Sequence, residues 1–197
     1  MSNRLLPISL FPVLAASLLC GQSASDLNSG LTISHDSSLD EFTLSWWGMD
    51  DFYYFVLGTE DLVDEPWVYF PYAGKGADAA LGPPPFATNA SKMFFRLEYT
   101  DDTNSELLTT DYNGAGIGAW RQLDLGFNPF DWVDTSENQI HDAWELYHFG
   151  ILGVDPAGDD DNDGLTNLEE SRTGGDPNLA AVATTAATLD LNIYAPR

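Results

Sequence analysis

The chain has 197 residues, of which 31 are Asp or Glu and only 7 are Lys or Arg, so its formal charge is −24 at pH 7. This charge excludes nucleic acid as a partner, because phosphate binding requires Lys and Arg to displace counterions. It also excludes attraction to anionic membrane surfaces. With 44% hydrophobic and 13% aromatic residues, the chain can form a folded core, and its length suits one domain or two small ones.

Residues 1–25 have the pattern of a secretory signal peptide. Arg4 supplies a positive charge, the stretch from Leu5 to Leu19 is almost wholly apolar, and small residues follow. We therefore expect a secreted or cell-surface protein. The alternatives are an uncleaved N-terminal anchor and lipidation at Cys20, although the residue before a lipoprotein cysteine is normally small. Without this segment the chain has no cysteine, and metal ions are the expected source of rigidity.

Residues 26–112 have the pattern of short β-strands. Phe42, Leu44 and Trp46 alternate with Thr43, Ser45 and Trp47, which is the period of a strand with one buried face. Similar apolar runs occupy residues 52–57, 67–70 and 93–99, and turn-forming residues separate them. The pattern predicts a mainly β fold that contains a small antiparallel β-sandwich. The layout is similar to a fibronectin-like module of secreted bacterial proteins.

The aromatic residues of this β-domain allow a second interpretation, in which they stack on sugar rings. The candidates for such stacking are Trp46, Trp47, Trp67, Tyr69 and Tyr72. Strict alternation favours a core position for most of them. Trp47 is the exception, because it lies on the strand face opposite Trp46 and is predicted either to pack under a loop or to be exposed.

Residues 113–133 are rich in glycine and are predicted to form a connector with one strand near residues 117–125. The spacing of Gly114, Gly116 and Gly118 is not the dinucleotide-binding fingerprint, which needs a preceding apolar strand and a following helix. We interpret these glycines as a turn.

Residues 159–170 (DDDNDGLTNLEE) have the oxygen-ligand spacing of a twelve-residue calcium loop. Three carboxylates at alternate positions can surround one ion, and Gly164 permits the sharp bend between them. A backbone carbonyl, an amide and a final glutamate would complete the coordination. The predicted ligands are Asp159, Asp161, Asp163, Leu165, Asn167 and Glu170.

A weaker copy of this loop lies 25 residues earlier, at residues 134–145. Its equivalent positions are Asp134, Ser136, Asn138, Ile140, Asp142 and Glu145. Gln139 replaces the bend glycine, where a positive φ is costly for a residue with a side chain. The copy either binds calcium weakly or has kept its fold and lost its ion.

The two loops and the residues after them, including Gly153 to Pro156 and Gly175 to Asn178, resemble the tandem calcium repeats of secreted bacterial proteins. These repeats are related to thrombospondin type 3 repeats and to EF-hand loops. The resemblance covers residues 134–178 and implies carboxylate-bound Ca²⁺ in an extracellular structural role, with Asp176 as a further ligand. Gln139, Gly175 and Thr166 depart from the family pattern. Residues 179–197 form a C-terminal tail in this division of the chain.

Each loop is expected to lead into a short helix. Ile140, Trp144, Tyr147 and Ile151 would form one apolar stripe on the first. His141, Glu145 and His148 share a face there, which leaves zinc as a less favoured alternative. The expected function is calcium binding by a structural or interaction module. Its macromolecular partner would be an extracellular polysaccharide or a surface protein. The alternatives are a carbohydrate-binding protein and, less favoured, a small hydrolase.

Overall fold

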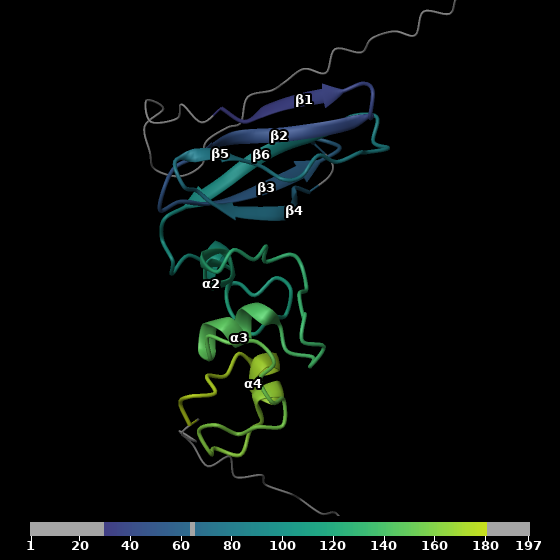
Figure 1. Cartoon of the computed structure of the whole chain (residues 1–197). Helices are drawn as coiled ribbons and strands as arrows, with labels where there is room; N and C mark the ends of the chain where they lie inside the picture. The colour runs from purple at the N-terminus through teal and green to yellow at the C-terminus, as the bar shows by residue number, and fades with distance from the viewer. Residues whose placement is uncertain (1–29, 64–65, 181–197) are drawn as a thin grey trace, which may run out of the picture.

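The computed structural model describes residues 30–63 and 66–180, and in this part of the chain six strands precede four short helices (Figure 1). The strands are β1 (Thr32–Asp36), β2 (Glu41–Gly48), β3 (Tyr53–Thr59), β4 (Val68–Lys75), β5 (Ala79–Leu81) and β6 (Phe94–Thr100). The helices are α1 (Glu106–Thr109), α2 (Ala119–Asp124), α3 (Asp142–His148) and α4 (Asn167–Thr173). The predicted mainly β class is therefore confirmed.

The six strands form two three-stranded antiparallel sheets, with strand orders β1-β2-β5 and β4-β3-β6. In the second sheet Phe55 of β3 lies opposite Ala73 of β4 and Glu98 of β6. The run predicted at residues 67–70 extends to Lys75 as β4, past Pro71. An edge strand tolerates proline because one side of its backbone needs no partner in the sheet.

Strand β3 is buried along its whole length because each of its faces packs against a different layer. Tyr54 and Val56 form a core cluster with Leu44 and Trp46 of the other sheet. On the opposite face, Tyr53 and Phe55 form a second cluster that includes residues of α1 and α2, namely Leu108, Ala119 and Leu123. Burial on both sides explains why β3 is continuously apolar, whereas β2 alternates.

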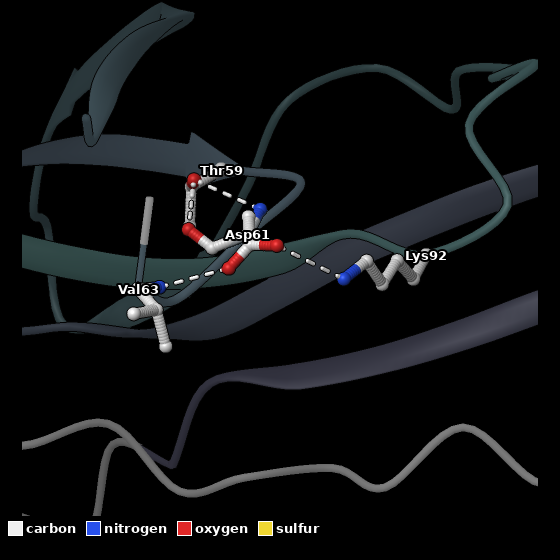
Figure 2. Close-up of polar contacts among 4 residues, drawn as sticks. All are labelled: Thr59, Asp61, Val63 and Lys92. Atoms are coloured by element: carbon white, nitrogen blue, oxygen red, sulfur yellow. Dashed lines mark hydrogen bonds and ion pairs between the residues drawn. The ribbon is translucent and has the colours of Figure 1, made fainter. Parts of the chain in front are cut away.

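The chain leaves β3 through a turn that side chains hold together (Figure 2). The Thr59 hydroxyl donates to the Asp61 carbonyl at 2.7 Å, and the Asp61 carboxylate accepts the N–H of Val63 at 2.9 Å. Lys92 Nζ lies 3.4 Å from the other Asp61 oxygen, so the turn is tied to the segment that precedes β6.

Residues 117–125 are not a strand, as the sequence had led us to expect, but contain helix α2. Gly118 is the N-cap, in an extended conformation, and Ala, Arg, Gln and Leu in the following turn all favour helix. The Gln122 side chain donates to the Ile117 carbonyl at 3.0 Å and so fastens the helix to the chain before it. Residues 113–133 contribute to two hydrophobic clusters, one of which contacts the second sheet.

Helices α3 and α4 follow the two predicted calcium loops, as expected, and lie beyond α2 on the side away from the sheets (Figure 1). Ile140 and Trp144 are fully buried in a cluster with Ala115 and Ile117. The predicted apolar stripe ends there, because Tyr147 and Ile151 are 40% and 62% exposed. Among the described residues, no helix has both the length and the apolar character needed to cross a membrane.

Candidate metal centre

The two predicted loops share one backbone hydrogen-bond pattern. The first carboxylate of each loop accepts the N–H groups of the fifth and sixth residues, and the fifth side chain accepts the N–H of the seventh. In the first loop these bonds join Asp134 to Asn138 (3.2 Å) and Gln139 (2.8 Å), and Asn138 to Ile140 (2.9 Å). In the second they join Asp159 to Asp163 (3.1 Å) and Gly164 (3.1 Å), and Asp163 to Leu165 (2.8 Å).

Backbone dihedral angles repeat in the same way. The fourth and sixth residues of both loops have positive φ: 56° at Glu137 and 71° at Gln139, then 62° at Asn162 and 96° at Gly164. Gln139 therefore makes the bend without a glycine, in a conformation that costs a residue with a side chain about 1 kcal/mol or more. The first loop, whose sequence matches the calcium pattern less well, therefore has the same backbone conformation as the second.

Each loop ends on a capped helix. The Thr166 side chain accepts the N–H of Glu169, whose carboxylate bonds back to Thr166, and this reciprocal capping box begins α4. In the first repeat the His141 ring takes the place of the threonine and accepts the N–H of Ala143 at 3.0 Å. Burial lowers the pKa of His141, and its neutral ring can accept this bond. Both caps fix the helix that carries the last predicted ligand of its loop.

The second loop brings acidic oxygens together. One carboxylate oxygen from each of Asp159, Asp161 and Asp163 lies within 4.8 Å of the other two. Three oxygens of this loop are buried without a hydrogen-bond partner: Asp161 Oδ2, Asn167 Oδ1 and Glu170 Oε2. Asn167 and Glu170 are 0% and 2% exposed. A buried oxygen without a donor costs free energy, and a cation held among these acceptors would offset that cost.

The electrostatics of Glu170 reflect its burial and the acids around it. Burial of its carboxyl raises its pKa to about 7, and the charges of Asp161, Asp163, Asp159 and Asp176 add to the effect. Without a cation, this glutamate holds a proton near neutral pH because ionisation would place a further negative charge beside the others.

The first loop satisfies its oxygens internally. The Asn138 side-chain amide donates to Glu145 Oε1 at 2.7 Å and to the Val154 carbonyl at 2.8 Å. Glu145 Oε1 also accepts the N–H of Val154 at 2.8 Å, and Ser136 Oγ lies 3.5 Å from Glu145 Oε2. Glu145 is fully buried, and the N–H groups of Asn138 and Val154 satisfy its Oε1.

The ninth residue differs between the loops as well. Both oxygens of Asp142 are engaged by Thr135, its N–H at 2.9 Å and its hydroxyl at 2.8 Å. Asn167 instead uses its amide hydrogens on the Asp155 carbonyl and on Asp160, at 3.0 and 2.9 Å, which leaves its oxygen without a donor. The sequence pattern pointed to Asp142 and Asn167, but not to the partners that orient them.

Asp176, suggested as a further ligand, lies close enough to Glu170 to raise its pKa but is not in the group of three aspartates. Its Oδ1 lies 3.4 Å from His148 Nδ1 and also accepts the N–H of Asn178 at 3.1 Å. The alternative zinc set is not assembled. Nε2 of His141 lies 3.2 Å from the Asp131 carbonyl, and Glu145 belongs to the first loop.

The β-domain aromatics divide largely as the alternation predicted. Trp46 is 3% exposed and packs edge-on against Tyr72, whereas Trp47 is 51% exposed. Arg96 lies over the Trp67 ring at 4.8 Å, and Tyr69 is 39% exposed beside Tyr112. These rings do not form one continuous exposed row, because Trp47 belongs to the first sheet and Tyr69 to the second.

Comparisons of the chain with protein-family models, with curated proteins and with solved structures find no match in any of the three. The functional assignment therefore depends on the geometry of the loops. Sequence reasoning missed Val154, Thr135 and Asp160, which bind predicted loop residues through polar groups. Of these three, only Asp160 could have been found from the sequence, because it belongs to the acidic run of residues 159–163.

Proposed function

We propose that this protein binds one Ca²⁺ in the loop of residues 159–170 and that the ion stabilises an extracellular structural or interaction module. The observation that carries the proposal is the set of buried, unpartnered oxygens at Asp161, Asn167 and Glu170 beside the aspartate group. In an acidic loop that is merely solvated, water would satisfy the carboxylates, and no oxygen would be buried without a partner.

The donor chemistry selects a hard divalent cation. The residues that would hold it are Asp159, Asp161, Asp163, Leu165 through its carbonyl, Asn167 and Glu170. All of these atoms are oxygens, whereas zinc favours histidine nitrogen or thiolate ligands. Their number and the mixture of carboxylate, amide and carbonyl suit the six to eight ligands of Ca²⁺ better than the few direct protein ligands of Mg²⁺.

A structural role follows from the charge of the C-terminal part. Residues 131–176 contain nine Asp and four Glu against a single Arg. An ion that binds the folded loop and not the unfolded chain adds its binding free energy to the stability of the fold. Extracellular sites with dissociation constants of roughly 10⁻⁴ to 10⁻³ M are sufficient for this purpose. Secretion is part of the proposal and depends on residues 1–25, which lie outside the described part.

Calcium titration of a matched pair of variants tests the proposal. Asp159→Asn and Asp134→Asn remove one charge from the first position of the second and first loops, and both side chains accept the same two backbone N–H groups. Calorimetry should give one site in the parent and in Asp134→Asn, with at least tenfold weaker binding in Asp159→Asn. Two equal sites in the parent, or selective loss in Asp134→Asn, would show that the loops are ranked wrongly.

Carbohydrate binding by the β-domain is the second candidate function. It is favoured by one observation, the 51% exposure of Trp47 on the first sheet, which leaves its indole ring accessible for stacking. The two-sheet unit would then be a sandwich that presents a single stacking platform. This candidate is compatible with a calcium site in the other part of the chain.

A further inference from the structure

A cavity of about 390 Å³ lies between the second sheet and α1, far along the chain from the proposed calcium loop. Its lining comes from β4, β6, α1 and the segment just after α1: Tyr69, Glu98, Glu106, Leu107, Thr110 and Tyr112. The volume is that of a small-molecule site. Neither the calcium loop nor Trp47 contributes to it.

Two tyrosines form an aromatic corner in this lining. The rings of Tyr69 and Tyr112 have centroids 5.3 Å apart and an interplanar angle of 70°. Phe130 supports both of them from outside the lining, at 5.9 Å from Tyr69 and 5.0 Å from Tyr112. The two rings pack edge to face against each other, so they form a continuous aromatic wall of the cavity.

The polar groups of the lining are acceptors. The Thr110 hydroxyl already donates to the Glu106 carbonyl at 2.7 Å, and the Tyr112 hydroxyl donates to the Leu107 carbonyl at 3.1 Å. Glu98 is held by Arg96 through Oε1 at 2.8 Å, and Glu106 lies at the exposed start of α1. A ligand that fits these walls must donate hydrogen bonds.

The charge of the lining residues determines which kind of hydrogen-bond donor is favoured in a ligand. Two of the six lining residues are acids and none is Lys or Arg, although Arg96 pairs with Glu98 at 2.8 Å, so the uncompensated charge is that of Glu106. Burial is the main reason that the pKa of Tyr112 lies above its ordinary value, and the Tyr69 hydroxyl and the charge of Glu98 add to the shift. A neutral sugar would gain hydrogen bonds here but no charge attraction, whereas an ammonium group gains both.

From these contacts we propose that the cavity binds an alkylammonium group, with Tyr69 and Tyr112 against its carbon chain and Glu98 and Glu106 accepting its N–H bonds. Such a group occurs on free diamines and at the end of a lysine side chain. The proposal is independent of calcium binding.

Titration of the full chain in saturating calcium with three probes tests it. Cadaverine supplies the ammonium, 1,5-pentanediol is its neutral counterpart of equal length, and N-acetyl-lysinamide carries the same ammonium on an amino acid. We expect cadaverine or N-acetyl-lysinamide to bind, and the tighter of the two identifies the source of the ammonium group. The diol should bind at least tenfold more weakly.

Variants separate a formed site from general attraction to an acidic protein. Glu106→Gln should weaken ammonium binding roughly tenfold, the loss expected for one charge-assisted hydrogen bond. Tyr69→Ala should weaken it as well, with thermal unfolding recorded to show that the variant is folded. The matched control is Glu41→Gln, which removes the same charge from β2 in the other sheet and should leave affinity unchanged.

Equal weakening in Glu106→Gln and Glu41→Gln would overturn the proposal, because the amine would then be attracted only by net charge. Equal binding of cadaverine and the diol would overturn it too. A parent protein that binds maltose in this cavity but no ammonium probe would assign the site to neutral sugars instead.

Discussion

Asn138 and Asp163 occupy the same position in two loops with the same backbone. Asn138 brings hydrogen-bond donors into its loop, whereas Asp163 brings only acceptors. The Asn138 amide supplies hydrogens to Glu145 and to the Val154 carbonyl. Asp163 supplies only oxygens, next to those of Asp159 and Asp161. This position is therefore one of the differences that let the first loop satisfy its oxygens with its own hydrogens.

Replacing that amide should convert the first loop into a calcium site. In Asn138→Asp, the bonds to Glu145 and Val154 are lost, and a third carboxylate joins Asp134 and Glu145. Without calcium we expect the free energy of unfolding to fall by about 1 to 3 kcal/mol, because buried acceptors lose their donors. Calorimetry should detect a second calcium site that restores the stability.

Ser136→Asp is the matched control for that change. It adds the same charge at an alternate position of the same loop but leaves the Asn138 amide in place. We expect no second site in this variant. A second site in Ser136→Asp, or its absence in Asn138→Asp, would show that charge count rather than the amide governs the first loop.

Glu170 should couple calcium affinity to pH. Its pKa of about 7 in the metal-free protein means that the carboxyl is protonated below pH 7, and bound Ca²⁺ requires the ionised form. Affinity should therefore fall by up to roughly tenfold for each pH unit below 7 and be nearly constant above 8. The pH dependence of folding stability in the metal-free protein is a separate effect. Because the pKa of Glu170 is raised in the folded state, its contribution to stability is present at low pH and is lost as the pH rises through 7.

Calorimetry at pH 6 and pH 8 in buffers of different ionisation enthalpy measures the proton released on binding. About one proton is expected at pH 6 and almost none at pH 8. Release of no proton at pH 6 would contradict this role for Glu170. Its replacement by Gln should abolish the pH dependence along with the tight binding.

Strand β2 shows how one element serves two surfaces. Trp46 lies in the core between the sheets and Trp47 on the opposite, exposed face. Trp46→Ala should lower the free energy of unfolding by about 3 kcal/mol or more, and Trp47→Ala by less than about 1 kcal/mol. Urea unfolding of the two variants provides the comparison, with each serving as the other's control.

The same Trp47 variant tests the carbohydrate candidate. If the exposed indole stacks on sugar, Trp47→Ala should lose retention on an insoluble polysaccharide while its stability is nearly unchanged. Large destabilisation by this variant would instead assign the ring to packing. The polysaccharide is tested with the alkylammonium cavity intact, so the two proposals are assessed separately.

At the scale of the whole molecule, the sheets and the two repeats are joined through shared cores. Helix α2 contacts β4, and residues 115 and 117 pack with Ile140 and Trp144 of the first repeat. The acidity of residues 134–177 by itself predicts that the whole segment depends on calcium. Because the first loop is bonded internally and Trp144 is buried, we expect calcium dependence only in the second repeat.

Chelation should accordingly open residues 155–177 and leave the first repeat and the sheets closed. The few basic residues make trypsin a selective probe: Arg172 lies in α4, whereas Arg121 lies in α2 beside the core. We expect cleavage after Arg172 to accelerate on calcium removal and cleavage after Arg121 to stay slow. Equal acceleration at both sites would mean that the ion supports the whole C-terminal part, and no change at Arg172 would mean that it supports none of it.

The sequence determined the features that are written in local spacing. Alternation in residues 42–47 predicted a strand with Trp46 inside, and the offset of 25 residues predicted two loops of one design, each followed by a helix. Such patterns are readable because strand and loop periods place side chains within a few residues of their partners.

Tertiary structure decided what depends on residues far apart in the chain. Residues 117–125 looked like a strand, yet helix α2 fills that place because Ala119 and Leu123 pack on Tyr53 and Phe55. Asn138 was predicted to be a weak oxygen ligand, whereas in the fold its amide donates to Glu145 and to the Val154 carbonyl. Periodicity in the sequence does not show which distant carbonyl a side chain reaches. The contact between Asn138 and Val154 is one of the differences between the two loops.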